Sequence, residues 1–354
     1  MPNKLRVALI GVGGIARAHV PGWKSSPHAE LIALADSNAE ILRQKGQEWE
    51  IARLYNDVES LLAAQDIDVV DICVPNRYHA PMAIAALTAG KHVMCEKPLA
   101  PTPEEIRGII EARDRSGRLL MTAQNFRFDA RSLALKAEVD KRTLGNIYHA
   151  RCWMLRRAAT PCRTSFTLKQ HSGGGPCIDL GVHILDLTMW MMGMPKPVTV
   201  SGVTHAQLHK QPGAFSVWGG ALPREWDVEE FATALVRFNN EASLVLEVSW
   251  LLHHKMPPGI PEDMQIWLYG DRGGAHWPSN QLLRSDIGSR QFIDTTLTCD
   301  QDLPSHTKEC HAFAEAIVNG GASPVPAEQS LYLMSILQGL YRSADAGGEV
   351  TLDL

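Results

Sequence analysis

The first 125 residues alternate apolar runs of strand length with helical patterns, and this alternation limits the possible folds more than any other feature of the chain. The runs lie at residues 5–10, 31–35, 69–74, 92–95 and 119–123. Strands that alternate with helices are typical of βαβ units in a parallel sheet. Because apolar residues dominate each run and do not alternate with polar ones, we expect helices to cover both faces of this sheet.

From about residue 145 the pattern changes to strands separated by short turns. Strands are predicted at residues 146–156, 198–205, 231–238, 243–252 and 265–269, and helical patterns lie at 175–192, 306–317 and 327–344. The sequence therefore predicts an α+β C-terminal domain with a large, mainly antiparallel open sheet and helices on one of its faces. The predicted domains are residues 1–125 and 126–354, and a length of 354 residues also favours two domains.

Charge balance and cysteine usage exclude several classes of protein. The chain has 34 Lys and Arg against 39 Asp and Glu, with no dense basic run, so we expect no nucleic-acid partner. The seven cysteines form no CxxC pair, which is typical of a reduced, cytoplasmic protein. Every apolar window of about 18 residues contains a charged residue, so we expect no membrane span.

A glycine-rich turn follows the first predicted strand. Its sequence, Gly11-Val12-Gly13-Gly14-Ile15-Ala16, fits G-x-G-x-x-G/A, in which the first glycine permits a tight turn and the second lets a pyrophosphate approach the backbone. Asp36 ends the second strand about 20 residues further on, where a carboxylate accepts the ribose hydroxyls of NAD. Because this carboxylate would repel a 2′-phosphate, we expect NAD as the cofactor rather than NADP.

Two further segments follow predicted strands at the carboxyl edge of the sheet, where open α/β folds bind ligands. Pro75 and Asn76 come after one strand, with His79 just beyond, and Glu96-Lys97 come after the next. A lysine at this edge is expected beside the reactive end of a bound cofactor. Position alone, however, fits an ordinary solvated lysine equally well.

In the second half, Asp179, His183 and Asp186 form one polar stripe on an otherwise apolar helical pattern at residues 175–192. Carboxylates and imidazoles buried in apolar surroundings must be paired or face a cavity, because burying them alone is costly. The alternative is a histidine that merely fills the core. The carboxylates on both sides of His183 favour a functional site instead.

Other histidines raise the idea of a metal site. His205 and His209 are four residues apart, and His253 and His254 are adjacent. This spacing is poor for a shared metal ion, so we predict a solvated surface there and no metal.

Together these motifs resemble the Gfo/Idh/MocA family of oxidoreductases, the group that contains glucose-fructose oxidoreductase and inositol dehydrogenases. The resemblance covers nearly the whole chain and includes Arg127 within Asn125-Phe126-Arg127-Phe128, and Gly173-Gly174-Gly175 before Asp179 and His183. It implies an N-terminal Rossmann domain and a C-terminal open sheet for substrate and oligomer contacts. It also implies a homodimer or homotetramer formed through that sheet.

The resemblance also assigns roles to residues. It implies that Lys97, Asp179 and His183 are catalytic. A weaker resemblance, of the run from Trp153 to the triple glycine, to members that oxidise inositols or pyranose sugars implies that Lys169 contacts substrate. The expected cofactor-binding residues are Gly11, Gly13, Gly14, Ile15, Asp36, Pro75, Asn76, His79 and Glu96, and the expected substrate-binding residues are Lys97, Arg127, Lys169, Asp179 and His183.

The residue types then indicate a reaction. Oxidation of a secondary alcohol needs a hydride acceptor and a base near the hydroxyl proton. His183 is the natural base, Asp179 can orient it, and Lys97 can stabilise the developing alkoxide, although the sequence does not decide whether lysine or histidine takes the proton. Two alternatives stay open: a reductase of a keto sugar or keto inositol, and a non-catalytic NAD-binding sensor or regulatory protein.

Overall fold

The computed structural model describes residues 4–300 and 303–354, which divide into two compact units. The first unit contains residues 4–128 and 303–331 of the described chain, and the second contains residues 129–300 and 332–354. All seven cysteines are free. Within the described ranges, no helix has the length and apolar character needed to cross a membrane.

The first unit is built on a parallel sheet of six strands in the order β3-β2-β1-β4-β5-β6. This is the order of a doubly wound dinucleotide-binding sheet, so the predicted Rossmann fold is confirmed. Only β3 was not predicted from the sequence, because three residues give no periodicity to recognise. The strands are β1 (Leu5–Ile10), β2 (Ala29–Ala35), β3 (Arg53–Tyr55), β4 (Val69–Ile72), β5 (His92–Glu96) and β6 (Leu120–Ala123).

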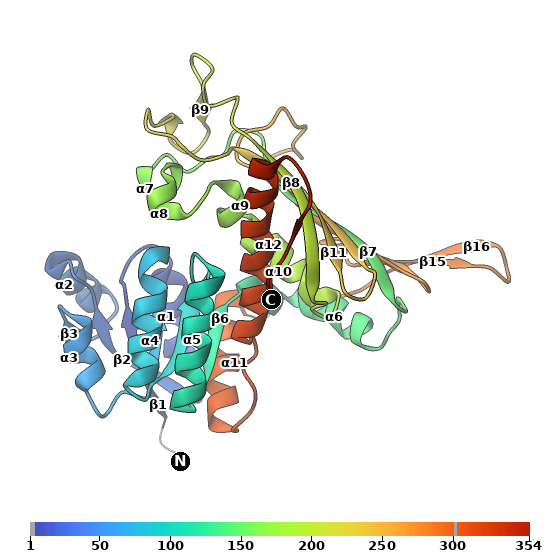
Figure 1. Ribbon diagram of the computed structural model, residues 1–354. Helices are drawn as coiled ribbons and strands as arrows, with labels where there is room; N and C mark the ends of the chain where they lie inside the picture. The colour runs from blue at the N-terminus through green and yellow to red at the C-terminus, as the bar shows by residue number, and fades with distance from the viewer. Residues whose placement is uncertain (1–3, 301–302) are drawn as a thin grey trace. The chain divides into compact units, whose positions relative to one another are not determined.

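Helices cover both faces of this sheet. Val7 and Leu9 of β1 belong to a core cluster with Trp23 and Phe313 from two helices, while the alternate residues of β1 are also buried. Helices α4 and α5 lie side by side, as Figure 1 shows. The helical elements are α1 (Ala16–Ser25), α2 (Ala39–Glu48), α3 (Val58–Ala63), η1 (Asn76–Tyr78), α4 (His79–Thr88), α5 (Pro103–Ser116), η2 (Asn125–Phe128) and α11 (Ser305–Val318).

Helix α11 belongs to the first unit, although the sequence pattern assigned it to the second domain. It packs against α1 so closely that a Cβ atom on Gly22 would lie 2.9 Å from Sγ of Cys310. The pattern of residues 306–317 did predict a helix. Its partner is encoded nearly 300 residues away, at α1, and local periodicity carries no information about that pairing.

The second unit contains a nine-stranded sheet in the order β16-β15-β14-β13-β7-β12-β11-β8-β17. Only the β12–β7 pair is parallel among its pairs of described strands, which confirms the predicted, mainly antiparallel sheet. A separate short ribbon joins β9 (Phe215–Ser216) and β10 (Gly220–Ala221). The sheet strands are β7 (Ile147–Arg156), β8 (Pro197–His205), β11 (Phe231–Phe238), β12 (Ser243–Ser249), β13 (Glu262–Gly270), β14 (Gly274–Trp277), β15 (Gln281–Asp286), β16 (Gln291–Thr296) and β17 (Val350–Thr351).

One face of this sheet is buried and the other is partly exposed. Ala232, Ala234 and Val236 of β11 are buried, whereas the intervening Thr233 and Leu235 are half-buried. Helix α10 contacts β7, β12 and β13. The helices are α6 (Ala130–Asp140), α7 (Thr164–Thr167), α8 (Lys169–Ser172), α9 (Pro176–Asp179), α10 (Gly181–Met191) and α12 (Ala327–Ala346), whose last part belongs to this unit.

Replacing Phe313 with Ala should lower the free energy of unfolding of the first unit by about 3–5 kcal/mol, because this fully buried ring joins α11 to the core. Val318→Ala is the matched control on the same helix. The Val318 side chain is 44% exposed, so its truncation should change stability by less than about 0.5 kcal/mol. Urea unfolding followed by tryptophan fluorescence measures both, and equal midpoints would contradict this packing.

Candidate functional site

The glycine-rich loop after β1 shows why each of its glycines is needed. Gly11 has a φ of +90°, and a Cβ atom there would lie 2.6 Å from the carbonyl oxygen of Cys73. Gly13 and Gly14 are exposed, and a Cβ on either would meet no atom within 4 Å. Gly11 is thus required by the fold itself, whereas Gly13 and Gly14 leave the backbone open to a pyrophosphate.

The start of α1 and the end of β2 complete the dinucleotide half of the site. Ile15 is the N-cap residue of α1, and no side chain caps this helix, which suits an anionic ligand. Asp36 follows β2; its carboxylate accepts from Val12 N at 3.0 Å and from Asn38 N at 2.9 Å. A carboxylate has further lone pairs, so Asp36 can also accept a ribose hydroxyl.

The loop after β4 is fastened to the segment after β5 by a buried histidine. His79 places Nδ1 2.7 Å from the carbonyl oxygen of Pro98 and Nε2 2.8 Å from that of Val74. Burial lowers the pKa of His79, so a neutral ring donates to one of these two acceptors at a time. Pro75 is exposed and Asn76 half-buried. Contacts of these three residues with a cofactor stay a prediction.

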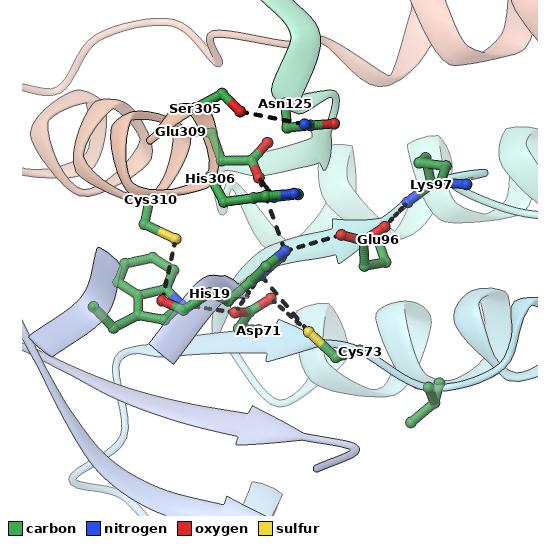
Figure 2. Close-up of polar contacts among 12 residues, drawn as sticks. His19, Asp71, Cys73, Glu96, Lys97, Asn125, Ser305, His306, Glu309 and Cys310 are labelled. Atoms are coloured by element: carbon green, nitrogen blue, oxygen red, sulfur yellow. Dashed lines mark hydrogen bonds and ion pairs between the residues drawn. The ribbon is translucent and has the colours of Figure 1, made fainter. Parts of the chain in front are cut away.

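Lys97 comes directly after β5, at the same edge of the sheet. Its side chain is half-buried, and its backbone N donates to Oε2 of Glu96 at 3.0 Å. Glu96 is buried, and its other carboxylate oxygen lies 2.9 Å from Nε2 of His19, as Figure 2 shows. The carboxylate of Glu96 thus points into the unit, and its expected cofactor contact is untested.

His19 is the centre of a buried polar cluster that the sequence did not predict. Its Nδ1 lies 2.8 Å from Oδ2 of Asp71, which also accepts from Trp23 Nε1 at 2.7 Å. His306 Nδ1 and Glu309 Oε1 are 2.7 Å apart nearby. The sequence contained one signal of this cluster: Asp71 is an acid inside the otherwise apolar strand Val69–Ile72.

Metal-ligating atom types meet in this cluster. Donor atoms of His19, Glu96 and His306, and of His19, Asp71 and Cys73, lie within 4.8 Å of one another. However, both ring nitrogens of His19 stand at hydrogen-bond distance from carboxylate oxygens. Ring protons between these atoms account for the arrangement without a cation.

Arg127 lies in η2, just after β6. It is buried, and its Nη1 donates to Oε1 of Gln329 at 2.6 Å. Its expected contact with substrate is not tested by these contacts.

In the second unit, the triple glycine leads into α9 and is held by distant residues. A Cβ on Gly174 would lie 2.0 Å from the Tyr341 hydroxyl, and one on Gly175 would lie 2.1 Å from the carbonyl oxygen of Glu229. The Glu229 carboxylate accepts from Gly175 N at 3.0 Å, from Cys177 N at 2.9 Å and from the Tyr341 hydroxyl at 2.8 Å. Side chains other than hydrogen are therefore excluded at both glycines.

Asp179 and His183 follow this turn on two successive helices. The predicted single helix over 175–192 is interrupted at Leu180, where α9 ends and α10 begins with φ −99° and ψ −39° at that residue. Asp179 and His183 are half-buried, whereas Asp186 is fully inside the core. The polar stripe thus includes two residues near the surface rather than three.

The carboxylate of Asp179 has defined neighbours. Its Oδ2 accepts from Trp250 Nε1 at 3.1 Å and lies 3.7 Å from Nη1 of Arg156. Arg156 also donates to Glu262 at 2.5 Å, and its guanidinium lies 4.6 Å from the ring centroid of Trp218. These residues, apart from Asp179, were not predicted as part of a site. The Asp179 carboxylate thus faces an indole donor and a guanidinium.

Lys169 starts α8 and is exposed. Its backbone N donates to Oδ1 of Asp227 at 2.6 Å, and its Nζ lies 5.4 Å from the ring centroid of Tyr341. Through Tyr341 it borders the triple-glycine turn. The predicted site residues thus form two sets, one in each unit: Lys97, Arg127 and the cofactor-binding residues in the first, and Lys169, Asp179 and His183 in the second.

The open glycine loop leads into a helix start that no side chain caps, and a carboxylate stands at the end of the next strand. This arrangement is typical of a dinucleotide-binding domain. Residues 5–124 match the profile of the oxidoreductase family with an NAD-binding Rossmann fold. Residues 132–276 match the GFO/IDH/MocA C-terminal domain. The chain therefore belongs to the Gfo/Idh/MocA family of oxidoreductases.

Several characterised proteins are similar to this chain. D-glucoside 3-dehydrogenase of Escherichia coli is 31% identical over an alignment 355 positions long, gaps included, which covers 99% of this chain and 98% of the relative. Myo-inositol 2-dehydrogenase of Thermotoga maritima is 29% identical over 189 residues, 53% of this chain and 55% of the relative. The solved structure of a levoglucosan dehydrogenase in complex with NADH and levoglucosan has the same fold, with a TM-score of 0.83 and 24% identity, and covers 99% of this chain and 100% of that one.

Gly13→Val should leave the fold intact but weaken NADH binding at least about tenfold, because its side chain would fill the space that a pyrophosphate needs. Gly11→Ala should instead destabilise the protein by about 1–3 kcal/mol, since φ and the Cys73 carbonyl both oppose a Cβ. Fluorescence titration and thermal unfolding separate the two effects. Gly348→Val, also at an open position, is the control, and unchanged NADH binding by Gly13→Val would refute this loop as the pyrophosphate site.

Proposed function

We propose that the protein is an NAD-dependent dehydrogenase that transfers a hydride between a ring secondary alcohol of a pyranose sugar or inositol and the nicotinamide. The observation that carries the proposal is the position of Lys97. It follows β5 at the carboxyl edge of the sheet, the edge that also carries the open Gly13-Gly14 backbone and Asp36. A primary amine at this edge suits chemistry next to a bound dinucleotide.

The proposed mechanism assigns one task to each residue. Bound NAD supplies the hydride acceptor. His183 removes the hydroxyl proton, and Asp179, one turn earlier, orients the imidazole and stabilises its charged form. Lys97 donates a hydrogen bond to the same oxygen and stabilises the negative charge that develops there. The sequence leaves open whether Lys97 or His183 takes the proton directly, and we assign that step to His183.

The substrate class rests on the relatives. The full-length relative is named a D-glucoside 3-dehydrogenase, which favours a pyranoside, and the inositol dehydrogenase relative, matched over about half of the chain, favours a cyclic polyol more weakly. A glucoside and an inositol share a six-membered ring with equatorial secondary alcohols. A reductase acting on the corresponding ketone would use the same residues, because equilibrium and cofactor ratio set the direction.

We further propose that the protein is a homodimer or homotetramer associated through the partly exposed face of the nine-stranded sheet. That face carries the half-buried aromatic rings of Trp153, Trp267 and Tyr269. Apolar area on one exposed face favours association between copies. Light scattering at micromolar concentration measures the mass, and a monomer would contradict this proposal.

Lys97→Met should lower kcat by about 10²- to 10⁴-fold while the Kd for NADH stays within about threefold, because the ammonium acts on the substrate oxygen rather than on cofactor binding. Turnover is measured as NADH absorbance with NAD and a panel of glucosides, levoglucosan and inositols. Lys24→Met, which removes an exposed lysine of the same unit, is the control. Unchanged turnover by Lys97→Met would reject the assignment of Lys97. If the wild-type protein binds NAD but oxidises no compound of the panel, the non-catalytic sensor is favoured instead.

The wild-type protein should bind NADH at least about tenfold more tightly than NADPH, because the Asp36 carboxylate repels a 2′-phosphate. Asp36→Ala should narrow this preference by weakening NADH binding and relieving the repulsion of NADPH. Isothermal titration with both dinucleotides gives the two Kd values. Ser37→Ala, at the next exposed position, should keep the wild-type ratio. Equal affinities in the wild-type protein would overturn the predicted NAD preference.

A further inference from the structure

We propose that His19 is a positioning residue for Lys97: by holding the Glu96 carboxylate, it fixes the backbone from which the Lys97 side chain leaves β5. This inference rests on the proposed function only in that it takes Lys97 to act on the substrate. The contacts themselves lie entirely within the first unit, on α1, β4 and β5. Figure 2 shows them together.

The first step is that His19 must donate from both of its ring nitrogens. Nδ1 lies 2.8 Å from Asp71 Oδ2 and Nε2 lies 2.9 Å from Glu96 Oε1. Ionised carboxylates only accept hydrogen bonds, so both nitrogens carry a proton and the ring is an imidazolium. Burial is the largest single effect and opposes this charge, but the Asp71 carboxylate and Cys73 together raise the pKa of His19 well above its usual value.

The second step is that this contact leaves Glu96 one orientation. Oε1 is held by His19 and Oε2 accepts from the Lys97 backbone N at 3.0 Å, so the carboxylate cannot rotate without losing one of the two bonds. Although burial would favour the neutral form of Glu96, the bond from His19 lowers its pKa. An ionised acceptor makes the stronger bond to the Lys97 amide.

The third step concerns charge balance in the closed interior. Asp71 and Glu96 bring two buried carboxylates, whereas burial raises the pKa of Glu309 and favours its neutral form. The imidazolium of His19 offsets one carboxylate, and the Lys97 ammonium also acts on Glu96. Without the ring, a buried carboxylate would lose its partner and Glu96 would be free to turn away from the Lys97 amide.

A stability role alone does not explain an ionic cluster here. A buried ion pair is often no more stable than well-packed apolar side chains of the same volume, and the surrounding core is apolar. What an apolar core cannot do is orient one carboxylate toward one amide. The chain of directional contacts ends at the Lys97 backbone N, which is why we infer that His19 positions Lys97.

The test is His19→Gln in the full-length protein, with hydrogen exchange resolved at single amides by mass spectrometry. The Lys97 amide should exchange at least about tenfold faster, because its acceptor is no longer held, while the amides of Val93, Met94 and Cys95 in β5 keep their protection. Turnover of the substrate found in the panel should fall about 10- to 100-fold in kcat with the KM for NAD within about threefold. His311→Gln, which removes another imidazole that contacts α1, at Ser25 and Gly22, should change neither.

The outcomes separate this proposal from the proposed function. Faster exchange across α1 and β5 together would assign His19 a general structural role and overturn the inference, as would an unchanged Lys97 amide or an unchanged kcat in an active enzyme. A faster Lys97 amide in a protein whose wild type turns over nothing in the panel would support the positioning contact and reject the proposed function. If His19→Gln does not fold, Glu96→Gln tests the same link, and it should weaken Lys97 amide protection in the same direction.

Discussion

The contact between Gly11 and the Cys73 carbonyl determines how the first unit can present a ligand site. Because Gly11 has no Cβ, the end of β1 can approach the end of β4 closely, and the chain can then turn into α1. That turn leaves the backbone of Gly13 and Gly14 open and brings Asp36 within hydrogen-bond distance of Val12. In a parallel sheet the carboxyl ends of all strands lie at one edge. Lys97, which follows β5, therefore lies at the same edge.

Features encoded within a few residues could be predicted from the sequence. The bounds of β1 and the glycine loop follow from a continuously apolar run and a spacing rule. The hairpin of β15 and β16 was missed because neither strand has a buried face: β15 is mostly half-buried and β16 is mostly exposed, and their apolar and polar side chains do not alternate. The unit to which α11 belongs was missed because its partner α1 is remote in the chain.

The same distinction applies to the candidate site. The sequence placed Lys97 at a strand end, which is a local relation, but the single helix predicted to carry Asp179 and His183 is interrupted at Leu180. The sequence could not predict that Glu229 and Tyr341 shape the triple glycine, or that His19 joins Asp71 to Glu96, because the hydrogen-bonded partners lie 52 to 112 positions apart. The side chains that hold the proposed reacting groups in place are therefore visible only in the folded structure, because they come from distant parts of the chain.

Helix α1 has two attachments only a turn apart. Its uncapped start follows the glycine-rich loop. In its first turn, His19 contacts the Glu96 carboxylate, which accepts a hydrogen bond from the Lys97 backbone N. The glycine loop and the His19 contact thus both depend on the first turn of one helix. We expect a substitution that displaces this turn to change both the open backbone of Gly13 and Gly14 and the contact of His19 with Glu96.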